Sequence, residues 1–141
     1  MTPVQSLLIE AACRRLVYRY CVLADAGRAD EAAALYAPDG VLEIAGARFV
    51  GREEIERRLA SAPPTQISRH VCANLVVDPL SDREAQGSAY LLLFRDDPAR
   101  PNDGPTLPLL VGEYKDAFVK EDGQAWMFKS RSLKTTFRKS A

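Results

Sequence analysis

The stretch GEYKDAFVKEDGQAWMFKSR (residues 112–131) decides the fold. Within it, two runs containing aromatic and aliphatic residues flank the four residues EDGQ (121–124). Strand-like runs separated by a short segment with Asp-Gly are typical of an antiparallel β-hairpin. We therefore predict a hairpin whose two strands extend outward over residues 107–121 and 124–137.

Two more strands are predicted on the N-terminal side of this hairpin. They cover QISRHVCANLVVD (66–78) and EAQGSAYLLLFR (84–95), and the short segment LSDRE (80–84) joins them. RDDPARPNDGPTLP (95–108) then leads into the hairpin, and its prolines and glycine exclude regular structure. A loop of this length is either a lid over a pocket or a flexible hairpin tip.

The first half of the chain has a helical pattern. Residues 4–25 carry apolar side chains every three to four positions, which predicts a long helix with one buried face. RADEAAALY (28–36) and GREEIERRLAS (51–61) predict two shorter helices. Between them, APDG (37–40) predicts a turn and VLEIAGARFV (41–50) a short hairpin.

The order of these elements and the composition together bound the class of protein. Helices followed by strands predict one α+β domain over residues 1–141, with a curved antiparallel sheet packed on the three helices. Lys plus Arg and Asp plus Glu both number 19, so the chain lacks the basic excess of proteins that bind nucleic acid or anionic membranes. No apolar run approaches the roughly 20 residues of a membrane span.

The counts of cysteine and histidine exclude further classes. Cys13, Cys21 and Cys72 form neither a disulfide framework nor a metal-binding motif, and with a single histidine we expect no zinc site. Free thiols indicate a reducing compartment, so we expect a cytoplasmic protein. Phosphate-binding loops and dinucleotide fingerprints are absent from the sequence, and we expect neither a cofactor nor a metal.

His70 is the only histidine, and it lies in a predicted strand. Strict alternation places Val71, Ala73, Leu75 and Val77 on one apolar face of that strand, and Ser68, His70, Cys72, Asn74 and Val76 on the other. A mixed face of this kind is typical either of solvent contact or of a pocket that combines apolar walls with a few polar groups.

Asp25 closes the first predicted helix, where the helix dipole disfavours a negative charge. One interpretation is that its carboxylate caps the turn into the second helix. The other is that it accepts a hydrogen bond from His70. A carboxylate in that position would fix the tautomer of the imidazole, stabilise its protonated form and leave the other ring nitrogen as a general base.

Arg131 is a candidate for offsetting negative charge that develops on a substrate. Alternation places it opposite Trp126 and Phe128, so Arg131 is predicted to face solvent unless a bulge redirects it. The remaining candidates are polar or sulfur-containing side chains that either contact a ligand or simply belong to the core and the sheet: Tyr20, Tyr90, Tyr114, Asn74 and Cys72.

The ordered set of segments resembles the SnoaL-like branch of the nuclear-transport-factor-type cone folds. The resemblance covers about residues 5–137, and these segments carry it: RYCVLAD (19–25), ADEAAALYAPDGVLEI (29–44), GREEIERRL (51–59), SRHVCANLVV (68–77) and GEYKDAFVKEDGQAWMFKSR (112–131). The group includes ketosteroid isomerase, scytalone dehydratase, polyketide cyclases and hexachlorocyclohexane dehydrochlorinase. It implies a curved sheet around helices, an apolar pocket, no cofactor and a homo-oligomer such as a dimer or trimer.

The resemblance also implies roles for particular residues. Asp25 and His70 match the aspartate–histidine pair of the dehydrochlorinase- and dehydratase-like members, and Arg131 matches an assisting arginine of the dehydrochlorinase. The chain lacks the second pocket histidine of the dehydratases.

Two functions therefore remain open. One is acid–base chemistry by a lyase or isomerase, namely dehydration, elimination or double-bond migration on a small apolar substrate. The alternative is a non-catalytic subunit that binds a small ligand or partners a ring-hydroxylating oxygenase. Only the site can decide between them.

Overall fold

The computed structural model describes residues 1–99 and 108–139. Its helices are α1 (Pro3–Asp25), α2 (Ala29–Ala33) and α3 (Arg52–Leu59). Its strands are β1 (Tyr36–Ile44), β2 (Ala47–Val50), β3 (Ile67–Pro79), β4 (Glu84–Asp96), β5 (Leu110–Val119) and β6 (Met127–Arg138).

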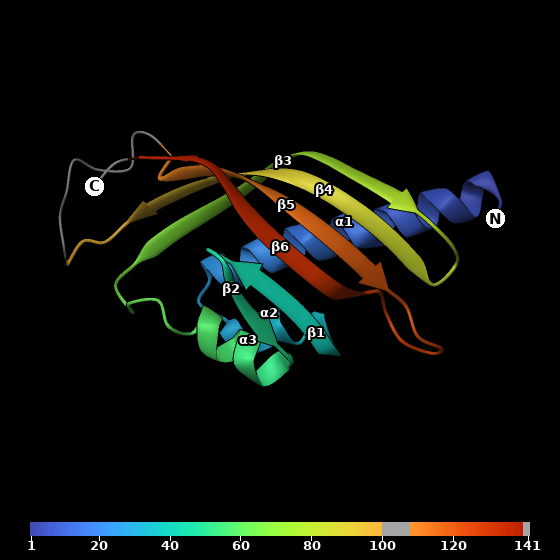
Figure 1. The fold of residues 1–141 in the computed structure, drawn as a ribbon, viewed down its shortest axis with the longest axis horizontal. Coiled ribbons are helices and arrows are strands. Elements are labelled where there is room, and N and C mark those ends of the chain that lie inside the picture. Colours follow the sequence, from blue (N-terminus) through green and yellow to red (C-terminus); the bar gives the residue numbers. More distant parts are fainter. Residues whose placement is uncertain (100–107, 140–141) are drawn as a thin grey trace.

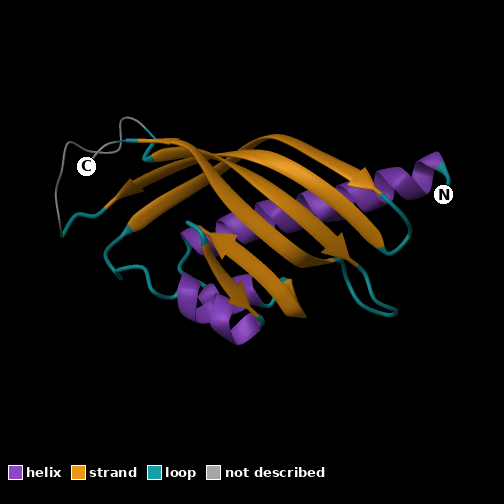
Figure 2. Ribbon diagram, in the orientation of Figure 1, coloured by secondary structure: helices purple, strands orange, loops and turns teal. Residues whose placement is uncertain are grey.

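The six strands form one curved sheet in the order β2-β1-β6-β5-β4-β3 (Figure 1). α1 runs along one face of the sheet and packs against β3, whereas α2 and α3 lie together beside β1 and β2 (Figures 1 and 2). The predicted α+β architecture is confirmed. Its predicted hairpins, β1–β2, β3–β4 and β5–β6, are antiparallel, but β1 joins β6 in parallel, so the complete sheet is mixed.

α1 begins and ends at identifiable signals. Thr2 caps its first turn and forms a capping box with Gln5, while Pro3 occupies a position at which a missing N–H costs nothing. The helix ends at Asp25, and Gly27 follows with φ of 71°. Its buried stripe faces the sheet and consists of Ile9, Cys13, Leu16, Val17, Tyr20, Cys21 and Leu23.

The predicted turn at residues 37–40 is wrong, because these residues belong to β1. Tyr36 pairs with Phe128 of β6 and Val41 pairs with Ser130, so four residues of β1 lie opposite a single residue of β6. The Pro-Asp-Gly sequence therefore forms an irregularity within a strand instead of ending it.

β3 contains a bulge that changes which side chains face α1. Ala73 pairs with Tyr90 and Val76 with Ser88, so two residues of β3 lie opposite one residue of β4. Asn74 takes the left-handed conformation at this point, with φ of 51°. The predicted faces are consequently wrong beyond Ala73. The inner face of the sheet, defined as the face toward α1, receives Ser68, His70, Cys72, Leu75 and Val77 from β3.

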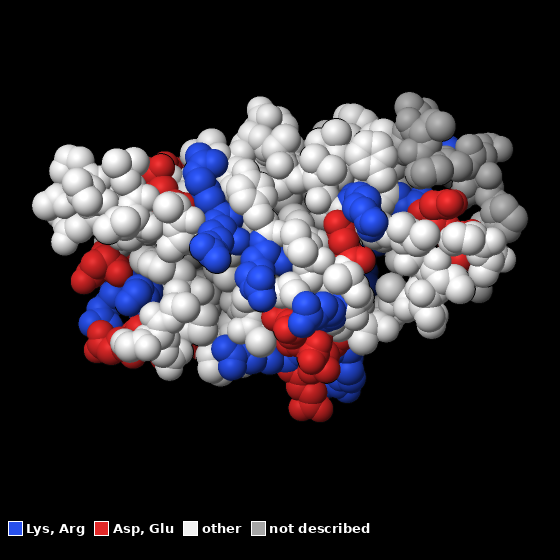
Figure 3. Space-filling model, turned by 180° about the vertical axis from the view of Figure 1, so that it is seen from behind, with Lys and Arg blue, Asp and Glu red and all other residues white. Residues whose placement is uncertain are grey.

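The buried residues form two clusters. The larger lies between α1, the short helices and the sheet, and aromatic rings occupy its centre: Tyr20, Tyr36, Phe118 and Phe128. The smaller lies on β4 and β5 and consists of Leu91, Leu93, Leu110 and Tyr114. Surface charge is mixed, and Figure 3 shows basic side chains beside acidic ones with uncharged areas between them.

Two further expectations concern a membrane-spanning helix and the segment 95–108. Among the described residues, no helix is long and apolar enough to cross a membrane. The segment 95–108 begins with the last residues of β4, but residues 100–107 lie outside the described residues. The choice between a lid and a hairpin tip therefore falls outside them as well.

Candidate active site

The structure brings Asp25 and His70 into contact. Asp25 is the last residue of α1, and its Oδ1 lies 2.6 Å from Nδ1 of His70 on β3. The backbone N–H of His70 also donates to both oxygens of the Asp25 carboxylate, at 3.1 Å each. These three contacts supply the favourable interactions that a carboxylate at the end of a helix requires.

This arrangement orients the imidazole. A carboxylate accepts a hydrogen bond from the tautomer that carries its proton on Nδ1, which leaves the lone pair on Nε2 free. The side chains of His70 and Asp25 retain 14% and 16% of their exposure, so the pair is mostly buried without being sealed. Its geometry is that of a general base held by an acidic partner.

An apolar wall lies beside the imidazole on the inner face of the sheet. His70 pairs with Leu93 of β4, and Cys72 pairs with Leu91. Both leucines belong to the smaller buried cluster with Leu110 and Tyr114, against which Cys72 also packs. A polar group next to an apolar wall is the combination that small-molecule sites use.

Arg131 is fully buried, so the prediction of a solvent-facing side chain is wrong. Ala117 of β5 pairs with Ser130 and Phe118 pairs with Phe128, which leaves Lys129 as an extra residue in β6. This bulge turns Arg131 to the same inner face as Phe128.

Asp116 holds the Arg131 guanidinium in the core. Nε and Nη2 of Arg131 donate to the two carboxylate oxygens at 2.7 and 3.1 Å. The guanidinium carbon lies 3.6 Å from the ring centroid of Tyr114 and 4.8 Å from that of Tyr20. The sequence reasoning missed Asp116, although it lies directly opposite Arg131 in the β5–β6 register.

Burial and the ion pair act in opposite directions on the pKa values of Asp116 and Arg131. Burial raises the pKa of Asp116, and the charge of Arg131 and its hydrogen bonds oppose that rise. Although burial disfavours its charge, the nearby Asp116 carboxylate brings the pKa of Arg131 well above its usual value. We treat both groups as charged because two hydrogen bonds join them. Nη1 of Arg131 has no hydrogen-bond partner within the described part of the chain.

The tyrosine and asparagine candidates separate into two groups. Tyr20 and Tyr114 are buried against Arg131, and burial raises the pKa of both. Tyr90 is 49% exposed, and Asn74 is exposed at the β3 bulge, so the structure does not bring either to His70. Cys72 is half-buried beside the wall, and its Sγ lies 3.4 Å from Sγ of Cys21.

Arg95 is a second charged residue that sequence reasoning missed. Its Nε donates to Oγ of Ser68 at 2.9 Å, and Ser68 precedes His70 by two residues on the inner face. Burial, together with the charges of Arg58 and Arg138, lowers the pKa of Arg95. Its alternation with Leu91 and Leu93 in β4 was the available signal, because that spacing directs all three inward.

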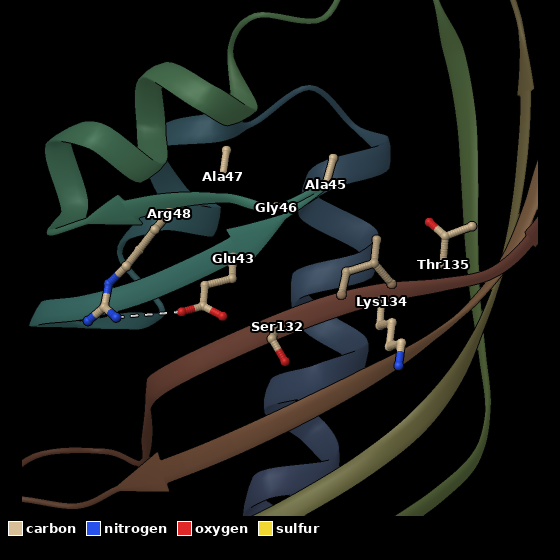
Figure 4. A pocket seen from close by; sticks show the side chains of 9 residues that line it. Glu43, Ala45, Gly46, Ala47, Arg48, Ser132, Lys134 and Thr135 are labelled. Carbon is tan, nitrogen blue, oxygen red and sulfur yellow. Dashed lines mark ion pairs between the residues drawn. The ribbon is translucent and has the colours of Figure 1, made fainter.

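Two surface hollows lie away from the imidazole. One of about 600 Å³ is lined by the β1–β2 turn and the neighbouring part of β6, and Glu43, Arg48 and Lys134 are among its lining residues (Figure 4). Arg48 and Glu43 pair there at 3.6 Å. Another of about 300 Å³ lies along β5 and β6. Neither is lined by His70 or Asp25, and within residues 1–99 and 108–139 no three His, Cys, Asp or Glu side chains are grouped to hold a metal.

The sequence was compared with models of known protein families. Residues 5–132 match the model of the SnoaL-like domain. The chain belongs to the SnoaL-like family. A comparison with curated protein sequences finds no match.

Solved structures agree with this assignment. A candidate scytalone dehydratase from Novosphingobium aromaticivorans is 28% identical, with a TM-score of 0.85 and coverage of 96% of this chain and 89% of that one. A Catenulispora acidiphila protein in complex with S-DNPA is 25% identical, with a TM-score of 0.75 and coverage of 89% and 91%.

An NTF2-like protein from N. aromaticivorans with a cystatin-like fold is 20% identical, with a TM-score of 0.75 and coverage of 92% and 84%, and supports the fold alone. The SnoaL-like chain thus has a fold of the polyketide cyclase and dehydratase type.

Proposed function

We propose that this SnoaL-like protein is a cofactor-independent lyase or isomerase that acts on a small, largely apolar substrate. His70 is the base and Asp25 orients it. The 2.6 Å contact between Asp25 Oδ1 and His70 Nδ1 carries the proposal, because it leaves Nε2 of an oriented imidazole available for proton transfer.

The reaction begins with removal of a proton from an activated carbon. Nε2 of His70 takes that proton, and Asp25 stabilises the imidazolium that forms. In a dehydration, the electron pair of the C–H bond forms a double bond as hydroxide leaves, and the imidazolium proton completes the released water. In an isomerisation, the same proton returns to another carbon of the conjugated system.

The surroundings of His70 suit this chemistry. Leu91, Leu93 and Leu110 supply an apolar wall for the substrate. The charge of Arg131 supports developing negative charge from the core, although two of its nitrogens are already bonded to Asp116. A relative that is a candidate scytalone dehydratase and another in complex with S-DNPA support a ligand in this cone.

The test is a screen with a spectroscopic readout. Small β-hydroxy ketones and β,γ-unsaturated ketones both become conjugated on dehydration or isomerisation, so ultraviolet absorbance reports turnover. Once a substrate is found, we expect kcat/KM to fall about 10³- to 10⁴-fold for His70→Ala and about 10²-fold for Asp25→Asn. Asp78→Asn removes an exposed carboxylate from the same strand and should leave turnover unchanged.

Full turnover by His70→Ala would exclude this mechanism. An independent check needs no substrate, because a single histidine gives a single imidazole in a ¹H–¹⁵N spectrum. We expect the Nδ1–H tautomer in the wild-type protein and loss of that preference in Asp25→Leu. The Nε2–H tautomer in the wild type would contradict the proposed orientation.

A second candidate function is non-catalytic binding of a small ligand or of a larger oxygenase chain. The observation that favours it is the filled interior, where Tyr20, Tyr36, Phe118 and Phe128 pack against one another. Stable co-purification with an oxygenase subunit, together with equal ligand binding by wild type and His70→Ala, would support this function over the lyase.

A further inference from the structure

Two cysteines meet directly beside the Asp25–His70 pair. Cys21 lies on α1, one helical turn before Asp25, and Cys72 lies on β3, two residues after His70 on the same inner face. Their sulfur atoms are 3.4 Å apart, and both cysteines are free thiols. The acid–base proposal uses neither of them.

The two thiols differ in exposure and in the direction in which their pKa values are shifted. Cys72 is half-buried, whereas Cys21 is buried. The hydrogen bond between the two sulfurs lowers the pKa of Cys72, partial burial opposes this effect, and the nearby charge of Arg131 lowers the pKa further. The same hydrogen bond, together with burial, raises the pKa of Cys21. A thiolate is the nucleophilic form of cysteine, so Cys72 is the more reactive sulfur.

Cys13 provides an internal comparison. It lies on α1 as well, is fully buried, and burial raises its pKa to about 12. Burial of this kind suppresses thiol chemistry. The reactivity expected at Cys72 therefore comes from its local partners and not from the fold in general.

We propose that Cys21 and Cys72 are a redox-responsive modification site, which a hydroperoxide converts into an intrachain disulfide. The Cys72 thiolate attacks one oxygen of hydrogen peroxide and, with one proton, yields a sulfenic acid and water. The Cys21 thiol then attacks the sulfenic sulfur, forming the S–S bond and releasing a second water. Two thiols lose two electrons and two protons, and one peroxide becomes two waters.

This crosslink joins the same two elements that the Asp25–His70 contact joins. The sulfurs approach from 3.4 Å to the roughly 2.05 Å of a disulfide, and the new bond ties the end of α1 to β3. Disulfides of proteins in reducing compartments are commonly transient and redox-sensing, so the site also agrees with the compartment expected from the cysteine count. We expect oxidation to move the His70 imidazole resonances.

The sequence makes the experiment direct. Trypsin cleaves after Arg14, Arg19, Arg28, Arg69 and Arg83, so each cysteine falls on its own peptide: Cys13 on 1–14, Cys21 on 20–28 and Cys72 on 70–83. Reduced wild-type protein is treated with one to ten equivalents of hydrogen peroxide, unfolded and alkylated. We expect more than half of the molecules to lose about 2 Da, to retain one alkylatable thiol and to yield the linked peptides 20–28 and 70–83, all reversed by dithiothreitol.

Three variants sharpen this result. Cys13→Ser should crosslink as the wild type does. Cys21→Ser should instead accumulate a Cys72 sulfenic acid that dimedone traps, because the second thiol is missing. Asp25→Asn should still crosslink, since the disulfide does not require the acid–base function, and this result separates the two proposals.

Several outcomes would overturn the proposal. Three alkylatable thiols after peroxide treatment, oxygen addition at Cys72 without a crosslink, or linkage that involves Cys13 or a second chain would each contradict it. Because the decisive measurement uses the wild-type protein, misfolding of a variant does not affect it.

Discussion

At the level of single residues, the buried guanidinium of Arg131 has a large effect on the stability of the fold. Arg131 is fully buried, and its charge is balanced by Asp116 and by the faces of Tyr20 and Tyr114. Removing one member of such a pair leaves the other charge buried without compensation, which costs more than the pair itself contributes. Arg131 is therefore a structural residue first, whatever it adds to chemistry.

We predict that Arg131→Met lowers the free energy of unfolding by about 3–5 kcal/mol, measured by urea denaturation. The cause is the Asp116 carboxylate, which loses both of its charged hydrogen bonds in the core. Arg48→Met is the matched control, because Arg48 pairs with Glu43 at 3.6 Å on the surface and is 65% exposed. That substitution should cost less than about 1 kcal/mol.

The double variant distinguishes a lost pair from a lost side chain. Asp116→Leu combined with Arg131→Met removes both charges, so it should recover a substantial part of the stability that the single Arg131→Met variant loses. A double variant as unstable as the sum of the two single variants would show that the cost arises from packing and not from the unpaired charge.

Residue by residue, the sequence predicted the candidate site unevenly. Contact between Asp25 and His70 was one of two interpretations of the sequence, the structure shows that contact, and their catalytic role stays a proposal. Asp116 was missed because a lone aspartate in a strand carries no signal until the opposite residue is known. Arg95 was missed although its alternation with Leu91 and Leu93 indicates the inner face, because an arginine at the end of a strand is most often exposed.

At the level of elements, the kinds of structure were predictable and the faces were not. Local residue patterns predicted α1, α3 and the four long strands, because such patterns depend only on neighbouring residues. Alternation failed after Ala73 and before Arg131, since each bulge inserts one residue and reverses every later side chain. The parallel pairing of β1 with β6 could not be predicted either, because it depends on a contact between segments that are distant in the sequence.

The bulge at Asn74 is a testable element. Its φ of 51° is a conformation that glycine and asparagine accept and that other residues adopt at a cost. We predict that Asn74→Ala lowers the free energy of unfolding by about 1 kcal/mol, while Asn74→Gly is within about 0.5 kcal/mol of the wild type. Urea denaturation measures both.

Asp78→Ala is the control, because it alters an exposed residue of β3 with ordinary backbone geometry. Deleting Asn74 is a complementary test, since it removes the extra residue of the bulge while strict alternation from Cys72 still directs Leu75 and Val77 toward the core. An Asn74→Ala protein as stable as Asn74→Gly would show that the left-handed conformation does not persist there.

At the level of the whole molecule, the outer face of the sheet is the surface that bears on assembly. The family resemblance implies a homo-oligomer, but apolar residues at the start of β5 do not supply its surface, because Leu110 is buried in the smaller cluster. Apolar exposure lies instead on β3 and β4, where Val71, Val76 and Tyr90 are each about half exposed. In the β3–β4 register Tyr90 lies opposite Ala73, between Val71 and Val76 along the neighbouring strand, and we group the three side chains as one apolar patch.

We predict that two copies associate through this patch of Val71, Val76 and Tyr90. A second copy is the occupant that fits, because the net charge of zero does not repel an identical chain. Sedimentation velocity at micromolar concentration should show a species larger than the monomer, and Tyr90→Lys should shift it to the monomer without loss of stability. Gln86→Lys adds the same charge elsewhere on β4 and should leave assembly intact.

A monomeric wild type would contradict the prediction. An oligomer unaffected by Tyr90→Lys would assign assembly to another surface, such as the exposed Val4, Leu7 and Leu8 of α1.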